Sequence, residues 1–313
     1  METRSRSRSS AREGGFTLIE LIIAMGVMLV VSGLMLQGMS DMSRMNRDQA
    51  NRSEMHAGIR NATALLQQEV GQAGRLAFPA PVITTGAIAP GTNWVSVGPS
   101  VTNMFTGVNL VIDSGANEEI VTVTGVNTAT NQIQAAFINS HPTNVAVRPA
   151  GGFAAGVIPT TMANGSSATV LKILGDVNSN GTLVYVEYTC DWALGRLSRN
   201  MMPYTAGAKP ALTVEQILLD NMLPNPPDPN GVVPPCFSYQ QQTISGRTYV
   251  TNVAIMTTVR TQDRDQVTGQ FQVVTKALLN VAPRNVFHTW QIAGLGYTNR
   301  IQPLPPSVLN LLN

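Results

Sequence analysis

One carboxylate lies inside the most apolar stretch of the chain. Glu20 comes shortly after Gly15 and Phe16 and is followed by an almost uninterrupted apolar run to residue 36. A charged side chain inside a membrane helix costs roughly 3 kcal/mol, so it normally has a partner. The positive end of the helix dipole is one such partner. A stronger one would be the α-amino group of Phe16 on a neighbouring chain, freed by cleavage after Gly15, and this pairing would fix the register between two helices.

A second set of oxygen-bearing side chains has the spacing of a calcium loop. Asp176, Asn178, Asn180 and Glu187, with a glycine at position 181, fit the pattern D-x-[DN]-x-[DN]-G-x5-E. However, two of the first three ligands are neutral amides, and the alternation in TLVYVEY predicts a strand that carries Glu187 away from the loop. We therefore favour a polar hairpin turn, in which Asn and Gly supply positive φ. Ca²⁺ is the alternative, and no other cofactor is expected.

The two cysteines, Cys190 and Cys236, lie beside predicted strands of one sheet. In an oxidising compartment they could form a disulfide, and closing a loop of about 46 residues would contribute roughly 3–4 kcal/mol through chain entropy. The alternative is two separate buried thiols. We favour the disulfide.

The sequence shows no spacing typical of a catalytic centre. His56, His141 and His288 are far apart, without an H-x-x-H or C-x-x-C partner. No glycine-rich phosphate loop and no local Ser/His/Asp signature is present. We therefore expect that the protein is not an enzyme.

The elements that position Glu20 are a basic leader and a long apolar segment. Residues 1–13 carry a net charge of +2, equal to that of the whole chain, so the body is formally neutral and nucleic-acid binding is not expected. As a helix, residues 16–36 would cover the roughly 30 Å of a bilayer core at about 1.5 Å per residue. The preceding arginines predict a cytoplasmic N-terminus and a body outside the membrane.

The sequence around Glu20 resembles the class III signal of type IV pilins and pseudopilins. Gly15 is followed by the residues FTLIEL and then by the apolar run. This resemblance implies that a prepilin peptidase removes residues 1–15 by cleavage after Gly15 and that Phe16 is then N-methylated. It also implies that Glu20 aligns neighbouring subunits during assembly. The alternative is an ordinary membrane anchor with a chance glutamate.

A single helix is predicted from about residue 17 to residue 75, because no proline occurs between Phe16 and Phe78. Its second half is polar except for a stripe of residues three and four apart, which we expect to pack on a sheet. The stripe consists of Met42, Met45, Met55, Ile59, Ala62, Leu66, Val70 and Ala73. A methionine-lined groove for a partner is the alternative.

The predicted fold class is α+β, with the N-terminal helix packed on an antiparallel sheet head. The helical part spans residues 16–78, of which 16–36 are transmembrane. Residues 79–165 contain five short strand candidates and predict an inserted meander or small barrel. The candidates are TNWVSV, GVNLVID, EEIVTVTGV, NQIQAAF and NVAVRP. Residues 166–290 predict the pilin-like head, and 291–313 a proline-broken, peripheral tail. The stretches MHAGIRNATALLQQEVGQAGR, GRLSRN and APRNVF resemble corresponding parts of PilW-like minor pilins.

With the resemblance, these features predict a PilW-like minor pilin of a type IV pilus system. It would be a single-pass protein of the inner membrane with its body in the periplasm, and later part of a pilus or pseudopilus at the cell surface. The implied partners are the prepilin peptidase, other minor and major pilins and the inner-membrane assembly platform. A J-type pseudopilin of a type II secretion system is one alternative, although its head is usually smaller. A pilin-anchored adhesin or ligand-binding protein, with its site in the 79–165 module, is the other.

Overall fold

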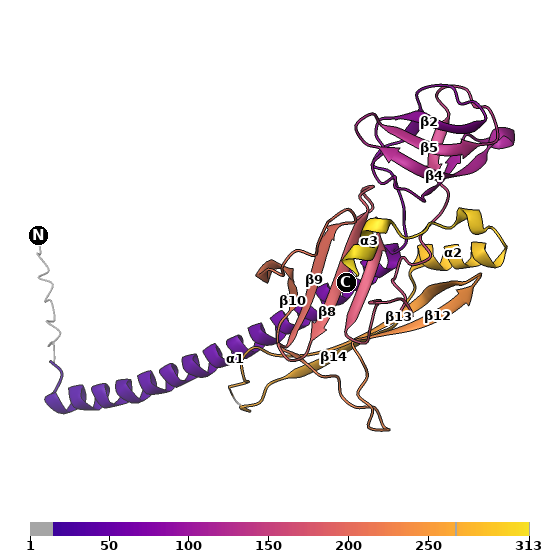
Figure 1. Ribbon diagram of the computed structural model, residues 1–313. Helices are drawn as coiled ribbons and strands as arrows, with labels where there is room; N and C mark the ends of the chain where they lie inside the picture. Colours follow the sequence, from indigo (N-terminus) through magenta and orange to yellow (C-terminus); the bar gives the residue numbers. More distant parts are fainter. Residues whose placement is uncertain (1–14, 267, 313) are drawn as a thin grey trace, which may run out of the picture.

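A long helix dominates the computed structural model, which describes residues 15–312 except residue 267. Helix α1 (Leu18–Gln72) contains 55 residues and leaves the rest of the molecule as a free rod over its first half (Figure 1). It begins at the N-cap Thr17 and ends at Ala73, before Gly74 with φ +82°. The prediction of one uninterrupted helix agrees with this element.

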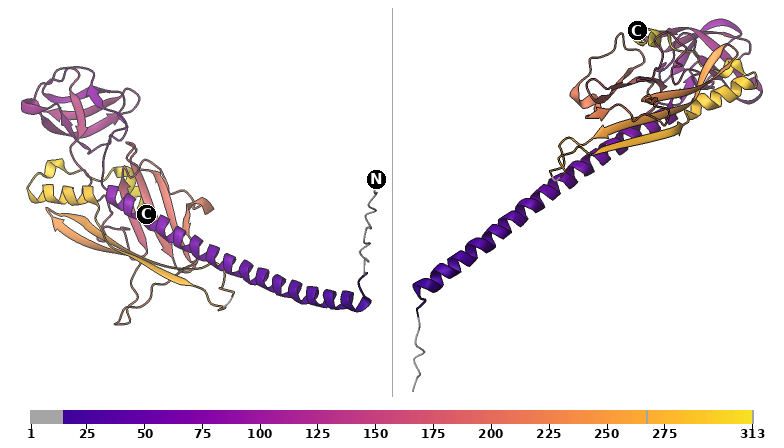
Figure 2. Two further views of the ribbon diagram at one scale, coloured as in Figure 1. Left: turned by 180° about the vertical axis from the view of Figure 1, so that it is seen from behind. Right: turned by 90° about the horizontal axis from the view of Figure 1, so that it is seen from below.

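The second half of α1 packs against the head through one apolar stripe. Met55, Ile59, Leu66 and Val70 are buried on this face. Met42 and Met45 were predicted to belong to the same stripe, but each is 66 % exposed. That part of the prediction is wrong, because the buried residues of α1 begin only at Asp48, so both methionines precede the part of the helix that packs on the head. Figure 2 shows the uncovered rod that α1 forms before it reaches the head.

The head contains two antiparallel sheets that face α1. The first has the order β10-β9-β8-β7. In the second, β13 pairs with β11 and β12, and also with β14. The strands of the first sheet are β7 (Val170–Gly175), β8 (Val184–Asp191), β9 (Arg196–Pro203) and β10 (Ile217–Leu219). Those of the second are β11 (Met222–Leu223), β12 (Phe237–Ile244), β13 (Arg247–Arg260) and β14 (Val273–Val281). The α+β fold class predicted from the sequence is therefore confirmed.

The core of the head joins the helix stripe to both sheets. Leu66 and Val70 of α1 share one buried cluster with Val186 of β8 and with Val253 and Ile255 of β13. Burial of a large aliphatic side chain stabilises a fold by roughly 1.5–3 kcal/mol. The helix is therefore an integral part of the head core.

Six further strands close into a barrel beyond the sheets, in the order β1-β2-β5-β4-β3-β6 (Figure 1). They are β1 (Val82–Thr84), β2 (Gly91–Gly98), β3 (Asn109–Ile112), β4 (Glu119–Asn127), β5 (Gln132–Phe137) and β6 (Ala146–Pro149). All of them lie inside the module predicted at 79–165. Strand β1 was not among the strand candidates, because three residues are too few for a recognisable alternation.

The C-terminal segment is not peripheral, so that prediction is wrong. The predicted tail, residues 291–313, holds only the last turn of α2 (Arg284–Gly294) and all of α3 (Pro306–Leu311), and its Ile301, Val308 and Leu311 are fully buried. Gln302 accepts a hydrogen bond from the Asn109 amide at 2.9 Å and donates one to its carbonyl at 2.7 Å. The prolines break the helices but do not prevent the apolar residues between them from filling the space between barrel and sheets.

Three short 3₁₀ segments complete the described elements. They are η1 (Gly115–Asn117), η2 (Val214–Gln216) and η3 (Thr298–Arg300). Thr213 and Gln216 form a capping box at the start of η2.

Candidate assembly site

The first turn of α1 holds Glu20 in a defined position. Its carboxylate accepts hydrogen bonds from the Thr17 amide at 2.9 Å and from the Thr17 hydroxyl at 2.8 Å. In return, Thr17 Oγ1 accepts a hydrogen bond from the Glu20 amide at 3.4 Å. This reciprocal arrangement is a capping box, which satisfies amides that the first helical turn leaves without partners. Glu20 is thus fixed beside the position where a chain cleaved after Gly15 would begin.

Nothing within the described part of the chain pairs electrostatically with Glu20. Every described ion pair lies farther along the chain, from Asp41 onwards. Phe16, the predicted methylated residue, is 89 % exposed, and Gly15 has no neighbouring atoms where a side chain would stand. Of the predicted leader, all but Gly15 lies outside the described residues. The site therefore presents one fixed negative charge and an accessible peptide segment next to it.

The apolar residues after Glu20 form an uncovered surface around the whole helix. Helix α1 is long and apolar enough to cross a membrane, and no part of its most apolar window is buried inside the protein. Leu29, Val30, Leu34, Met35 and Leu36 are each more than 60 % exposed. A helix that is apolar on all sides needs lipid or other apolar helices around it. This supports membrane anchoring by this segment.

The predicted disulfide partners lie on different sheets of the head. Cys190 near the end of β8 and Cys236 next to β12 are bonded to each other, with their Cα atoms 6.5 Å apart. The bond covalently joins the two sheets that enclose α1. Cys236 is fully buried, and 4 % of Cys190 is exposed.

The residues with calcium-loop spacing do not gather around one point. The buried Asp176 carboxylate accepts hydrogen bonds from the Asn180 and Gly181 amides, both at 3.0 Å. Asn180 Oδ1 accepts one from the Thr182 amide at 3.0 Å. The arrangement is that of a polar turn whose side chains bond to their own backbone.

Glu187 lies apart from that turn, in the middle of β8. Its carboxylate is 3.0 Å from Lys209 Nζ and 3.8 Å from Lys172 Nζ, and it accepts a hydrogen bond from the Tyr185 hydroxyl at 2.9 Å. Asn178 is exposed, and its amide lies 3.9 Å from the sulfur of Met201. In the described part of the chain, no three His, Cys, Asp or Glu side chains are arranged to hold a metal.

A buried ion pair between α1 and β9 was not recognised from the sequence. The Glu69 carboxylate is 1 % exposed and contacts the Arg199 guanidinium through two nitrogens, with Nε 3.1 Å from each carboxylate oxygen. Burial and the neighbouring Glu69 raise the pKa of the Tyr188 hydroxyl, so it stays protonated and donates to Glu69 at 2.5 Å. The available signal was the position of Glu69 on the apolar stripe, three residues after Leu66.

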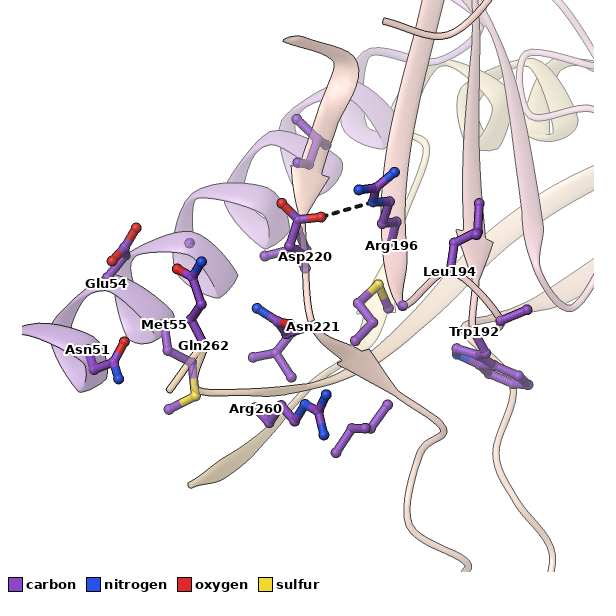
Figure 3. A pocket seen from close by; sticks show the side chains of 18 residues that line it. Asn51, Glu54, Met55, Trp192, Leu194, Arg196, Asp220, Asn221, Arg260 and Gln262 are labelled. Carbon is purple, nitrogen blue, oxygen red and sulfur yellow. Dashed lines mark hydrogen bonds and ion pairs between the residues drawn. The ribbon is translucent and has the colours of Figure 1, made fainter. Parts of the chain in front are cut away.

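An open pocket of about 720 Å³ lies where α1 passes the edges of the two sheets. Figure 3 shows Asn51 and Glu54 on the helix side and Arg196, Asp220 and Arg260 on the sheet side. Arg196 and Asp220 form an ion pair at 3.1 Å, but both side chains are about half exposed, so it adds little stability. The pocket is open and its wall carries charges of both signs. It therefore resembles a protein contact surface more than an enclosed ligand site.

Comparison with known proteins gives one result for the N-terminal region. The family model described as the prokaryotic N-terminal methylation motif matches residues 10–36. A search of curated proteins found no match to the chain. The matched residues include Gly15, Phe16 and Glu20 and the apolar first half of α1. The chain therefore carries the N-terminal methylation signal of type IV pilins and pseudopilins, on a membrane-type helix that continues into an antiparallel sheet head.

Proposed function

We propose that this protein is a minor pilin of a type IV pilus system. The observation that carries the proposal is a single helix with two different halves. The first half is apolar, uncovered and matched by the methylation motif, whereas the second half is built into the core of a large head. A subunit of this kind can leave the membrane and keep its head unchanged while its helix enters a bundle of similar helices.

The proposed pathway has three steps. A prepilin peptidase cleaves after Gly15 and Phe16 is N-methylated, while the inner membrane holds the apolar half of α1 and the head lies in the periplasm. Glu20 then pairs with the terminal amine of a neighbouring subunit, which neutralises both charges in an apolar surrounding. The helices of major and other minor pilins, brought together by the inner-membrane assembly platform, form a filament-priming or tip complex. No enzymatic step is assigned to this chain.

A J-type pseudopilin is the second candidate, since it would share the same signal and helix. The size of the head and the added barrel of residues 82–149 favour the pilus.

Deleting the gene and measuring both sheared surface filaments and secreted proteins distinguishes a minor pilin from a pseudopilin. Loss of filaments with normal secretion supports the pilus, and the reverse supports the pseudopilin.

The pathway is tested by the mass and N-terminal sequence of the protein expressed with and without a prepilin peptidase. We expect a chain that begins at N-methyl-Phe16 only when the peptidase is present. Gly15→Val should block cleavage, because the peptidase would have to accept a β-branched side chain at the cleavage site. Gly26→Val is the matched control, since a side chain at Gly26, within α1, would meet no neighbouring atoms, as at Gly15. An uncleaved wild-type chain in the presence of the peptidase would reject the proposal.

A further inference from the structure

The outer face of the barrel contains a row of uncharged side chains around one tryptophan. Along β2, Val95 and Val97 point into the barrel core, so Trp94 and Ser96 point outward. The pairing of β2 with β5 places Trp94 beside Gln134 and Ser96 beside Gln132. The pairing of β4 with β5 places Gly125 on the far side of Gln134 and Asn127 on the far side of Gln132.

The indole of Trp94 extends across this face onto Gly125. A Cβ atom on Gly125 would lie only 3.0 Å from Cη2 and 3.3 Å from Cζ2 of the tryptophan. Gly125 does not have a positive φ, so its backbone does not require glycine, and the missing side chain makes room for the ring. Trp94 is nevertheless 48 % exposed. One part of the ring therefore rests on the barrel while another remains open to solvent.

The surroundings of this ring contain hydrogen-bonding groups but no charge. A groove of about 360 Å³ runs beside Trp94, and its lining residues, 85–89 and 93–96, are all neutral. Its wall is held in place by Asn93, whose amide donates to the Ala89 carbonyl at 2.7 Å. Gln132 donates to the Ser96 hydroxyl at 3.1 Å. No hydrogen bond within the described residues engages the side chain of Gln134, so its amide is available.

From this geometry we propose that the Trp94 face of the barrel binds a neutral oligosaccharide. A pyranose ring has an apolar face of C–H groups and a rim of hydroxyls. The indole can cover the C–H face, while the Gln134 amide, the Ser96 hydroxyl and the Asn127 amide nitrogen can pair with the rim. The Asn127 oxygen already accepts from the Ala129 and Thr130 amides, and Gln132 is bonded to Ser96 and Thr130. A nucleic acid or an acidic sugar would find no cation on this face to pair with its charge. This inference goes beyond the proposed assembly function and does not depend on it.

The position of the barrel is consistent with contact to an external ligand. It lies beyond the sheets, at the end of the molecule remote from the start of α1 (Figures 1 and 2). The Trp94 face is on the labelled strands β2, β5 and β4. A membrane-held or filament-held subunit would therefore present it away from its anchor.

The test uses the full chain in detergent with four probes: cellohexaose, maltohexaose, N-acetylchitohexaose and, as an acidic comparison, a galacturonic acid oligomer. Binding is measured by calorimetry and by tryptophan fluorescence. We expect saturable binding of at least one neutral probe and weaker binding of the acidic one. Trp94→Ala should weaken it by about tenfold or more, as expected when an aromatic anchor is truncated. Gly125→Val should also weaken it, because the new side chain displaces the ring.

Trp192→Phe is the matched control, since Trp192 lies in the pocket between α1 and the sheets and should not affect binding. Unchanged circular dichroism and melting temperature show that a variant is still folded. No saturable binding of any neutral probe would overturn the proposal, as would binding that Trp94→Ala leaves unchanged or tighter binding of the acidic probe. Cleavage at Gly15 is measured on the same samples, so failure of the sugar site is distinguishable from failure of the pilin pathway.

Discussion

Two of the carboxylates on helix α1, Glu20 and Glu69, lie in opposite surroundings. Glu69 is 1 % exposed and is neutralised within the chain by Arg199, with a further hydrogen bond from Tyr188. Glu20 is exposed and, among the described residues, accepts hydrogen bonds only from Thr17, one turn away. Glu69 therefore stabilises the fold. Glu20, on the same helix, has no counter-charge among the described residues.

The difference follows from what surrounds each half of the helix. A buried carboxylate is tolerated only when its charge and its lone pairs are both satisfied, which Arg199 and Tyr188 do for Glu69. The apolar half of α1 has no sheet beside it, so no side chain of the head can reach Glu20 (Figure 1). In a chain cleaved after Gly15, we therefore expect the partner of Glu20 to come from another molecule. Substitutions near the two carboxylates should therefore change different properties.

The largest expected effect is on the stability of the head. Arg199→Ala leaves Glu69 buried without a counter-charge, which should lower the free energy of unfolding by about 3–5 kcal/mol. Arg196→Ala is the matched control on the same strand, because its ion pair with Asp220 is solvent-exposed and worth at most about 1 kcal/mol. Urea denaturation followed by fluorescence measures both. Equal effects of the two substitutions would show that the buried pair is not special.

The second-largest expected effect concerns the disulfide between Cys190 and Cys236 in the head. Replacing Cys190 and Cys236 together with serine opens a connection across 46 residues, which should lower stability by about 4 kcal/mol in the chain-entropy account. Denaturation of wild type with and without a reductant provides the matched measurement, and the double variant should not respond to the reductant. A wild type that is equally stable after reduction would contradict this expectation.

The two carboxylates also differ in how visible they are in the sequence. Glu20 is conspicuous because its neighbours are all apolar. Glu69 follows two polar residues, Gln67 and Gln68, so its place on the apolar stripe, three residues after Leu66, is easily overlooked. Its partner Arg199 is 130 residues away in the sequence, on a strand whose place in the sheet depends on pairing that periodicity alone does not determine.

Local periodicity does not determine tertiary contacts, and this limit also explains which of the other structural predictions were right and which were wrong. The stripe from Met55 to Ala73 was predictable because helical spacing is local, and the strands β2 to β6 were predictable from their alternation and turns. Met42 and Met45 continue that spacing, but where the sheets stop is a tertiary property. The burial of Ile301 and Leu311 likewise depends on a space created by the barrel and the sheets together, which no local pattern encodes.

A third prediction uses a buried histidine in the barrel. His141 lies between Asp113 at 3.1 Å and Glu119 at 2.8 Å. Burial alone would lower the pKa of His141, but the hydrogen bonds and charges of Glu119 and Asp113 outweigh it and raise the pKa above its ordinary value of 6.5. A raised folded-state pKa stabilises the fold below pH 6.5, and this contribution is lost as the pH rises through the folded-state value.

The barrel should therefore melt at a lower temperature as the pH is raised from about 6 to 9, measured by calorimetry. His141→Gln should remove this dependence, whereas His56→Gln, at an exposed position of α1, should leave it intact. The effect should be smaller than that of Arg199→Ala, because deprotonation of His141 leaves a neutral ring that still donates one hydrogen bond. A pH dependence that survives in His141→Gln would assign it to another group.

The smallest effect on stability should accompany the largest effect on assembly. Glu20→Gln keeps the capping box, since glutamine at this position can still accept a hydrogen bond from the Thr17 amide. The free energy of unfolding of the head should therefore change by no more than about 0.5 kcal/mol. The substitution removes only the charge. If Glu20 pairs with the terminal amine of a neighbour, incorporation into sheared filaments should fall sharply while cleavage after Gly15 continues.

Asp41→Asn is the matched control for this last prediction, because Asp41 is an exposed carboxylate on the same helix that does not line the pocket beside the sheets, and it should not alter incorporation. Thr17→Ala provides the complementary change, since it removes the hydroxyl that holds Glu20 but keeps the charge. Normal incorporation of Thr17→Ala with loss for Glu20→Gln would assign the role to the charge. Normal incorporation of Glu20→Gln would reduce Glu20 to a helix cap, and the contrast with Glu69 would then be one of burial alone.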